Sequence, residues 1–99
     1  MAITKPDALW AACSVAPTGE VLANGGVRRQ ATHQTPGEYL LALDAPIDET
    51  QCVVLATLRE GDASFIRWSK PDDRTLLVRT FNTAGDPTDA PFDVLIIKP

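Results

Sequence analysis

The residues of this sequence that could act on a substrate are few. A hydrolytic site needs a nucleophile, a base and an orienting acid within hydrogen-bond reach. The serines are Ser14, Ser64 and Ser69, and none stands in the Gly-x-Ser-x-Gly pattern that presents a nucleophile on a tight turn. His33 is the single histidine, so such a mechanism has to use it. His33 lies in a polar stretch typical of an exposed strand end, so we expect no enzyme and keep a small enzyme using His33 as a remote alternative.

The two cysteines do not form a recognisable metal site. Cys13 and Cys52 each lie in an apolar stretch, and with His33 they supply three scattered ligands without the close pairs of a zinc site. We therefore expect two buried thiols that act as small apolar side chains, and a disulfide between neighbouring strands stays open. The chain has no phosphate-binding loop and no dinucleotide fingerprint, so we expect no metal and no cofactor.

Acidic residues are paired at three places, namely Asp48-Glu49, Asp72-Asp73 and Asp86 with Asp89. Carboxylate pairs can cleave glycosides or bind calcium. All three pairs fall in predicted turns, where aspartate caps its own backbone, and we interpret them as turn residues. The 86–89 loop remains an open alternative as a site for a hard cation.

Composition excludes several classes of partner. The 99 residues include nine basic and thirteen acidic side chains, and the net charge of -4 repels nucleic acid and anionic lipid. No window approaches the ~20 apolar residues that cross a bilayer, and no basic segment precedes an apolar run at the start. We expect one domain over residues 1–99, synthesis in the cytoplasm, and no nucleic acid or membrane partner.

Short apolar segments separated by glycine, proline and aspartate predict β-strands. The expected segments are 8–15 (a strand or a short helix), 27–33, 38–44, 51–59, 64–69, 75–81 and 92–98. Turn signals crowd residues 16–26 and indicate short strands or an ordered loop. The pattern of Lys70–Asp73 predicts a type I turn. Asn82–Pro91 is predicted to be a loop that crosses between sheets. The prediction is an all-β fold: a six- to seven-stranded antiparallel sandwich, jelly-roll-like or immunoglobulin-like, or a small barrel.

The closing segment is apolar on both faces. Successive strand residues point to opposite sides, so Phe92, Val94 and Ile96 share one face while Leu95 and Ile97 share the other. A domain of this length has one core and buries only one face of such a strand.

Two further segments, Tyr39–Leu43 and Cys52–Leu55, are also apolar on both faces. We expect all three to share one sheet whose outer side is a self-association surface, with a single larger core as the alternative. The residues predicted to lie in an oligomer interface or in the core are Leu41, Leu43, Val53, Leu55, Leu95 and Ile97.

The order of elements from Gly37 to Pro99 resembles a known group of proteins. It runs Gly37-x-Tyr39-x-Leu41-x-Leu43-Asp44, Cys52–Leu58, Val78–Asn82 with Gly85, and Asp89–Ile97. This order is similar to that of the β-sandwich head and tip modules of bacteriophage tail fibres and related virion-associated structural proteins. The resemblance implies a small jelly-roll-like sandwich, often a homotrimer, that serves as a structural or attachment part.

The sequence therefore predicts a non-enzymatic structural protein that forms a symmetric homo-oligomer. The resemblance implies that the oligomer is a trimer and belongs to a phage virion or tail. Its partners would be other copies of itself and other virion proteins. A carbohydrate- or surface-binding module that uses the Asn82–Pro91 loop is the alternative, since exposed aromatic rings can stack on glycans. The candidate rings are Trp10, Tyr39, Phe65, Trp68, Phe81 and Phe92.

Overall fold

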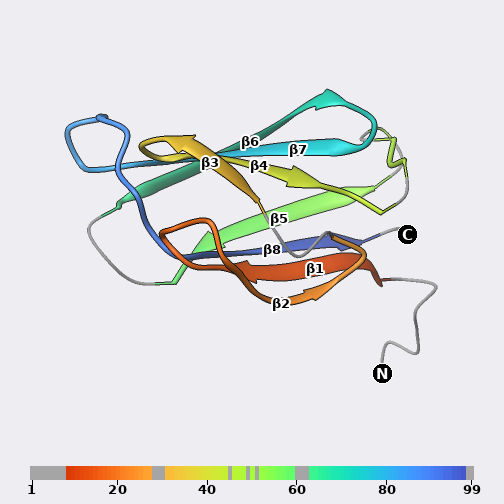
Figure 1. Ribbon diagram of the computed structural model, residues 1–99. Helices are drawn as coiled ribbons and strands as arrows, with labels where there is room; N and C mark the ends of the chain where they lie inside the picture. The colour runs from red at the N-terminus through yellow and green to blue at the C-terminus, as the bar shows by residue number, and fades with distance from the viewer. Residues whose placement is uncertain are drawn as a thin grey trace, which may run out of the picture.

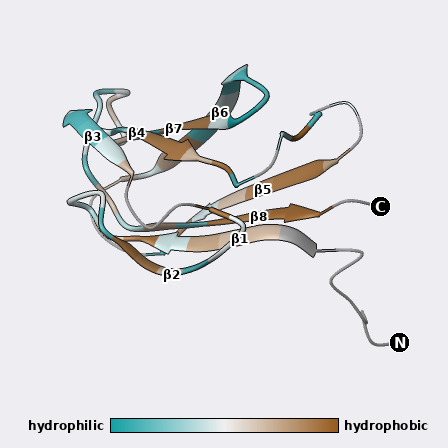
Figure 2. Cartoon of the chain, turned by 45° about the vertical axis from the view of Figure 1, so that its right-hand side comes forward, coloured by the Kyte–Doolittle hydropathy of each residue, from teal (hydrophilic) through white to brown (hydrophobic). Residues whose placement is uncertain are grey.

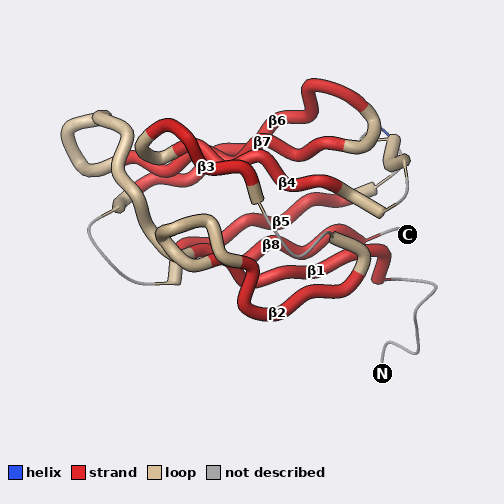
Figure 3. The backbone as a smooth tube through the Cα atoms, viewed as in Figure 1, coloured by secondary structure: helices blue, strands red, loops and turns tan. Residues whose placement is uncertain are grey.

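Eight antiparallel strands form two four-stranded sheets (Figures 1 and 3). A computed structural model describes residues 9–27, 31–44, 46–48, 50, 52–59 and 63–97, with the backbone alone at residues 9 and 10. The strands are β1 (Leu9–Val15), β2 (Val21–Gly25), β3 (Thr32–Thr35), β4 (Glu38–Ala42), β5 (Val53–Leu58), β6 (Phe65–Asp72), β7 (Thr75–Phe81) and β8 (Phe92–Ile97). The strand order is β2-β1-β8-β5 in the first sheet and β3-β4-β7-β6 in the second.

The core lies between the two sheets and is built by period-2 alternation. In β8, Phe92, Val94 and Ile96 are buried, as the pattern predicts, and Leu76 and Val78 of β7 face them from the second sheet. Burying each of these large side chains contributes about 1.5–3 kcal/mol. The remaining members of the core are Ala11, Cys13, Val15, Val27, Ala31, Tyr39, Leu41, Leu43, Ile47 and Val54.

The described residues already form eight strands, so the prediction of six or seven strands was too low. The additional strand is β2, which pairs with β1 across a tight turn. Gly19 makes that turn possible because its φ of 94° suits glycine, and its N–H donates to the Ala16 carbonyl at 2.9 Å. Asn24 and Gly25, which have turn chemistry, belong to β2. The 8–15 segment is a strand, and its alternative as a helix was wrong because β1 pairs with β2 and β8.

Two segment boundaries differ from the prediction. Strand β3 begins at Thr32, later than the expected 27–33 segment, and Val27 makes only an isolated bridge to Leu43. Strand β6 continues through Lys70 and Pro71 to Asp72, so the predicted turn over Lys70–Asp73 was misplaced. The predicted positions 8, 28–30, 49, 51 and 98 and the Trp10 side chain lie outside the described residues.

The expectation that three doubly apolar segments share a sheet holds for two of them. Strands β5 and β8 are neighbours in the first sheet, whereas β4 lies in the second. Local alternation carries no information about which sheet a strand joins. The Asn82–Pro91 loop crosses from β7 to β8, that is, between the sheets, as predicted. No closed barrel forms among the described strands, and the order differs from the immunoglobulin one, in which the first, second, fifth and fourth strands share a sheet.

Candidate functional site

The outer side of the first sheet carries a continuous set of apolar side chains. We call the set formed by Ala12, Val53, Leu55, Leu95 and Ile97 the outer apolar face. The strand registers place Leu55 beside Leu95, Val53 beside Ile97 and Ala12 beside Leu95. Leu55 is 48% exposed and Val53 46% exposed, while Leu95 and Ile97 are half-buried. Figure 2 shows β5 and β8 as hydrophobic strands side by side.

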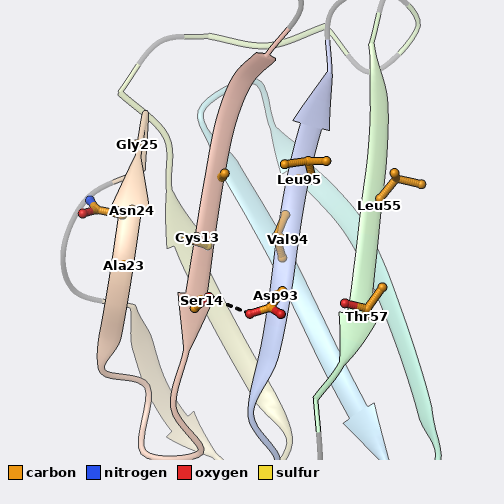
Figure 4. Close-up of a pocket in the computed structure, with 11 residues that line it drawn as sticks. Cys13, Ser14, Ala23, Asn24, Gly25, Leu55, Thr57, Asp93, Val94 and Leu95 are labelled. Atoms are coloured by element: carbon orange, nitrogen blue, oxygen red, sulfur yellow. Dashed lines mark hydrogen bonds between the residues drawn. The ribbon is translucent and has the colours of Figure 1, made fainter. Parts of the chain in front are cut away.

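An open hollow of about 620 Å³ lies on this face. Figure 4 shows Leu55 and Leu95 on neighbouring strands, with Ala23, Asn24 and Gly25 of β2 at the far edge. The side chains that β1 contributes there are small, and the lining of the hollow consists mainly of carbon atoms. The hollow is therefore suited to an apolar occupant.

Polar groups on the outer face gather at one end and are bonded to one another. Asp93 accepts a hydrogen bond from the Ser14 hydroxyl at 2.6 Å (Figure 4), and the Arg59 guanidinium lies 3.7 Å from the same carboxylate oxygen. The charge of Asp93 is thus balanced locally. The centre of the face, around Leu55 and Leu95, carries no charged side chain in the described register.

The outer side of the second sheet differs in character. It carries Glu38, Arg67 and Arg79, and the Arg79 guanidinium lies 3.7 Å from the Glu38 carboxylate. The same side also carries apolar side chains, since Leu40, which is 38% exposed, stands opposite Leu77, and Phe65 stands opposite Phe81. Charged side chains are thus interspersed with apolar ones on the second sheet, whereas the outer apolar face has none near its centre.

The structure sorts the six residues predicted to lie in an interface or in the core. Leu41 and Leu43 are core residues, since both are almost fully buried. Val53, Leu55, Leu95 and Ile97 belong to the outer apolar face. Sequence alone could not separate them because each follows the same alternation.

His33 lies in a cluster that the sequence did not predict. Its Nδ1–H donates to the Glu38 carbonyl at 2.9 Å, and its Nε2 lies 3.1 Å from Asp89 Oδ2. The ring stacks on Tyr39 with centroids 4.2 Å apart. The His33 side chain is 13% exposed, so the expected surface histidine was wrong.

The cluster joins segments and holds no nucleophile. Asp89 also accepts the Gly37 N–H at 2.7 Å, which fastens the 82–91 loop to the turn between β3 and β4. The Ser14 and Ser64 hydroxyls are bonded elsewhere, to Asp93 and Thr83. The cluster is explained as a structural tie, and spacing in sequence could not reveal it because His33 and Asp89 come from distant segments.

Asp48 and Asp72 behave as predicted, whereas Asp89 bonds to Gly37 and His33 and does not cap its own turn. Asp48 accepts the N–H and hydroxyl of Thr50, and Asp72 accepts the N–H of Arg74. These bonds lower the pKa of both carboxyl groups because they stabilise the charged form. Among the residues that the structure describes, no group of three metal-ligating side chains comes together.

The two thiols occupy different environments. Burial raises the pKa of Cys13 to about 11, with the nearby Asp93 carboxylate adding to the effect, so this thiol stays protonated at neutral pH and is a poor nucleophile. Cys52 is half-buried, and no disulfide joins the two. Across the described ranges, no helix is long and apolar enough to span a membrane.

The aromatic rings divide between the core and the surface. Tyr39 and Phe92 are buried, with ring centroids 4.9 Å apart in an edge arrangement. Phe65 is 51% exposed and stands opposite Phe81 in the register of β6 and β7. Together with Ser64, Arg67 and Gly85, these two rings line a second hollow of about 520 Å³.

Comparison with known proteins does not identify a family for this chain. No family model, curated protein or solved structure matches the chain. The candidate function therefore rests on the surfaces themselves.

Proposed function

We propose that this protein is a non-enzymatic structural module that assembles with copies of itself through the outer apolar face. The observation that carries the proposal is the contrast between the two outer sides of the same fold. The side with Leu55 and Leu95 has no charged side chain at its centre, whereas on the other side Glu38, Arg67 and Arg79 are interspersed with the apolar residues. Apolar surface that extends over neighbouring strands is seldom left in water.

A second copy is the occupant that this face fits best. A face made of aliphatic side chains is complementary to itself, and closed symmetry is the usual result of such contacts. The chain's net charge of -4 opposes association, but the centre of the face has no charged group to add to the repulsion. The resemblance to phage tail modules supports the narrower proposal of a virion- or tail-associated part. Eight strands in two sheets match a jelly roll in number.

The test compares one substitution on each outer side. Leu95→Asp places a charge on the outer apolar face, and Leu40→Asp places the same charge on the opposite side. We expect the wild-type chain to have a mass above that of one copy at micromolar concentration, by light scattering after size exclusion. Leu95→Asp should lower that mass, and Leu40→Asp should leave it unchanged. A monomeric wild-type protein, or equal effects of both substitutions, would contradict the proposal.

The Phe65 hollow favours a second candidate function, the binding of a carbohydrate. Phe65 presents an exposed ring beside Phe81, and Arg67 supplies hydrogen-bond donors at its edge. The adjoining loop is ordered, because the Asn82 side chain accepts the N–H groups of Ala84 and Asp86. Aromatic faces and fixed polar groups are what sugars require. A glycan array should then show binding that Phe65→Ala abolishes, and an array without any signal would exclude this function.

A further inference from the structure

We propose that two copies of this chain pair edge to edge through β5, antiparallel, about a two-fold axis that passes beside Leu55. This inference rests on the proposed function, because it names one of the contacts through which copies assemble. It concerns the edge of the first sheet, while the proposed function concerns its face. The two contacts meet at Leu55, which belongs to both.

The four edges of the two sheets are protected to different degrees. Proteins blunt exposed edges with short strands, bulges, prolines and charges, because an open edge pairs with other strands. Strand β2 has a register shift against β1, and β3 has four residues with an irregular register. Strand β6 carries Arg67, Lys70 and Pro71 and has a register shift.

Strand β5 has none of these devices. Its six residues, VVLATL, include no charge, no proline and no glycine, and its register against β8 is regular from end to end. Figure 2 shows β5 as a hydrophobic strand at the margin of the first sheet. Of the four edges, β5 is therefore the one suited to receive another strand.

The hydrogen-bonding direction of β5 follows from one bond beyond its end. The Arg59 N–H donates to the Pro91 carbonyl at 3.2 Å, on the side of β8. Residues in an antiparallel ladder alternate in the direction of their backbone groups. Val53, Leu55 and Thr57 therefore bond to β8, while Val54, Ala56 and Leu58 direct their N–H and C=O groups toward the free edge. Within the described ranges, β8 is the only strand in the ladder with β5.

Of the antiparallel registers that these directions allow, the proposed one places the exposed Leu55 side chains of the two copies opposite each other. Val54 stands opposite the partner's Ala56 as a hydrogen-bonded pair, and Val53 stands opposite the partner's Thr57. Leu55 then stands opposite the partner's Leu55 in a non-hydrogen-bonded pair, where Cα atoms are about 4.5 Å apart and side chains are closest. The most exposed side chain of the outer apolar face is covered by its own copy, and Arg59 stays outside the ladder.

The dimer so formed is expected to be weak by itself. A six-residue ladder is small beside the ~1,600 Å² of a standard interface, so the edge pair should dissociate on dilution. Contacts between outer apolar faces would then join such pairs. A subunit with both an edge contact and a face contact can assemble beyond a dimer, with copies added in twos, in place of the trimer that the resemblance implies.

Cysteine cross-linking tests the register. In a Cys52→Ser background, Leu55→Cys should form a disulfide-linked dimer under mild oxidation, since its Cα distance falls within the range of a disulfide. Val53→Cys alone and Thr57→Cys alone should not, because each is offset from its own copy by four residues, about 13 Å along the strand. A mixture of the Val53→Cys and Thr57→Cys proteins should cross-link. Absence of the Leu55→Cys dimer at concentrations where the protein associates would overturn the proposal.

A pair of further variants separates the edge from the face. Ala56→Pro removes an N–H that β8 does not use, so it should abolish association through the edge while circular dichroism remains that of a β protein. In a Leu95→Asp background, the Leu55→Cys dimer should persist, because Leu95 lies one strand inward. If the protein associates but the Leu55→Cys dimer does not form, only the edge contact is contradicted. If the Leu55→Cys dimer forms but Leu95→Asp does not lower the mass of the assembly, only the face contact is contradicted.

Discussion

At the scale of single residues, Tyr39 joins two loops to the core through one oxygen atom. Its hydroxyl donates to the Pro17 carbonyl at 2.7 Å and accepts the buried Ala90 N–H at 3.3 Å. The ring lies between His33, which stacks on it, and Phe92. Burial raises the pKa of Tyr39 to about 12, because the phenolate would lose its hydration there.

Removing this hydroxyl should therefore be costly. We expect Tyr39→Phe to lower the free energy of unfolding by about 1–3 kcal/mol, since it leaves a buried N–H without an acceptor. Urea denaturation measures the change. Thr83→Ala, which removes an exposed hydroxyl bonded to Ser64, serves as the control and should cost less than about 0.5 kcal/mol. Equal midpoints for wild type and Tyr39→Phe would show that the hydroxyl does not join the loops.

At the scale of elements, the hairpin of β3 and β4 depends on Gly37. Its φ is 72°, its N–H donates to Asp89, and its carbonyl accepts the Thr80 N–H at 2.8 Å. A Cβ atom at this position would lie 2.5 Å from the Thr80 oxygen and 2.8 Å from the Thr88 nitrogen. The hairpin, β7 and the 82–91 loop approach one another so closely that only glycine fits.

A comparison of two glycines isolates this steric effect. Gly85 also has a positive φ, of 89°, but a Cβ there would meet open space. We expect Gly85→Ala to cost about 1–2 kcal/mol from backbone strain alone. Gly37→Ala should cost at least about twice that, because backbone atoms must also move. Urea denaturation of both variants gives the difference, and equal losses would contradict the close approach.

At the scale of the whole molecule, stability should fall in alkali. The pKa of Cys13 is raised from 9.0 to about 11 and that of Tyr39 from 10.0 to about 12, so the unfolded chain loses these protons first as pH rises. Deprotonation therefore favours unfolding. The contribution of both groups to the free energy of unfolding is complete below pH 9, falls as pH rises, and is lost above about pH 12.

Denaturation at a series of pH values tests this expectation. The wild-type chain should begin to lose stability near pH 9, where the unfolded Cys13 thiol ionises. Cys13→Ala removes that group, so its loss should begin later, near pH 10, where the unfolded Tyr39 phenol ionises. The same onset in both proteins would show that Cys13 does not contribute.

Much of the fold could be predicted from the sequence, because strand alternation is local. The inward set Phe92, Val94 and Ile96 and the outward set Leu95 and Ile97 follow from period 2 alone, and the structure has both. Turn chemistry was a weaker guide. Asn24 and Gly25 have turn chemistry, yet pairing with β1 holds them in a strand. Lys70 and Pro71 also lie within a strand, between Ser69 and Asp72, which pair with β7.

What the sequence by itself determined is the β-class of the chain and which side chains share a face of each strand. Only the tertiary structure decided which sheet each strand joins, and hence that Leu41 is core while Leu55 lies on the outer apolar face. It also brought His33 to Asp89 and left β5 at an edge. The physical reason is that side-chain direction is set between adjacent residues, whereas strand order and packing are set by contacts between residues far apart along the chain.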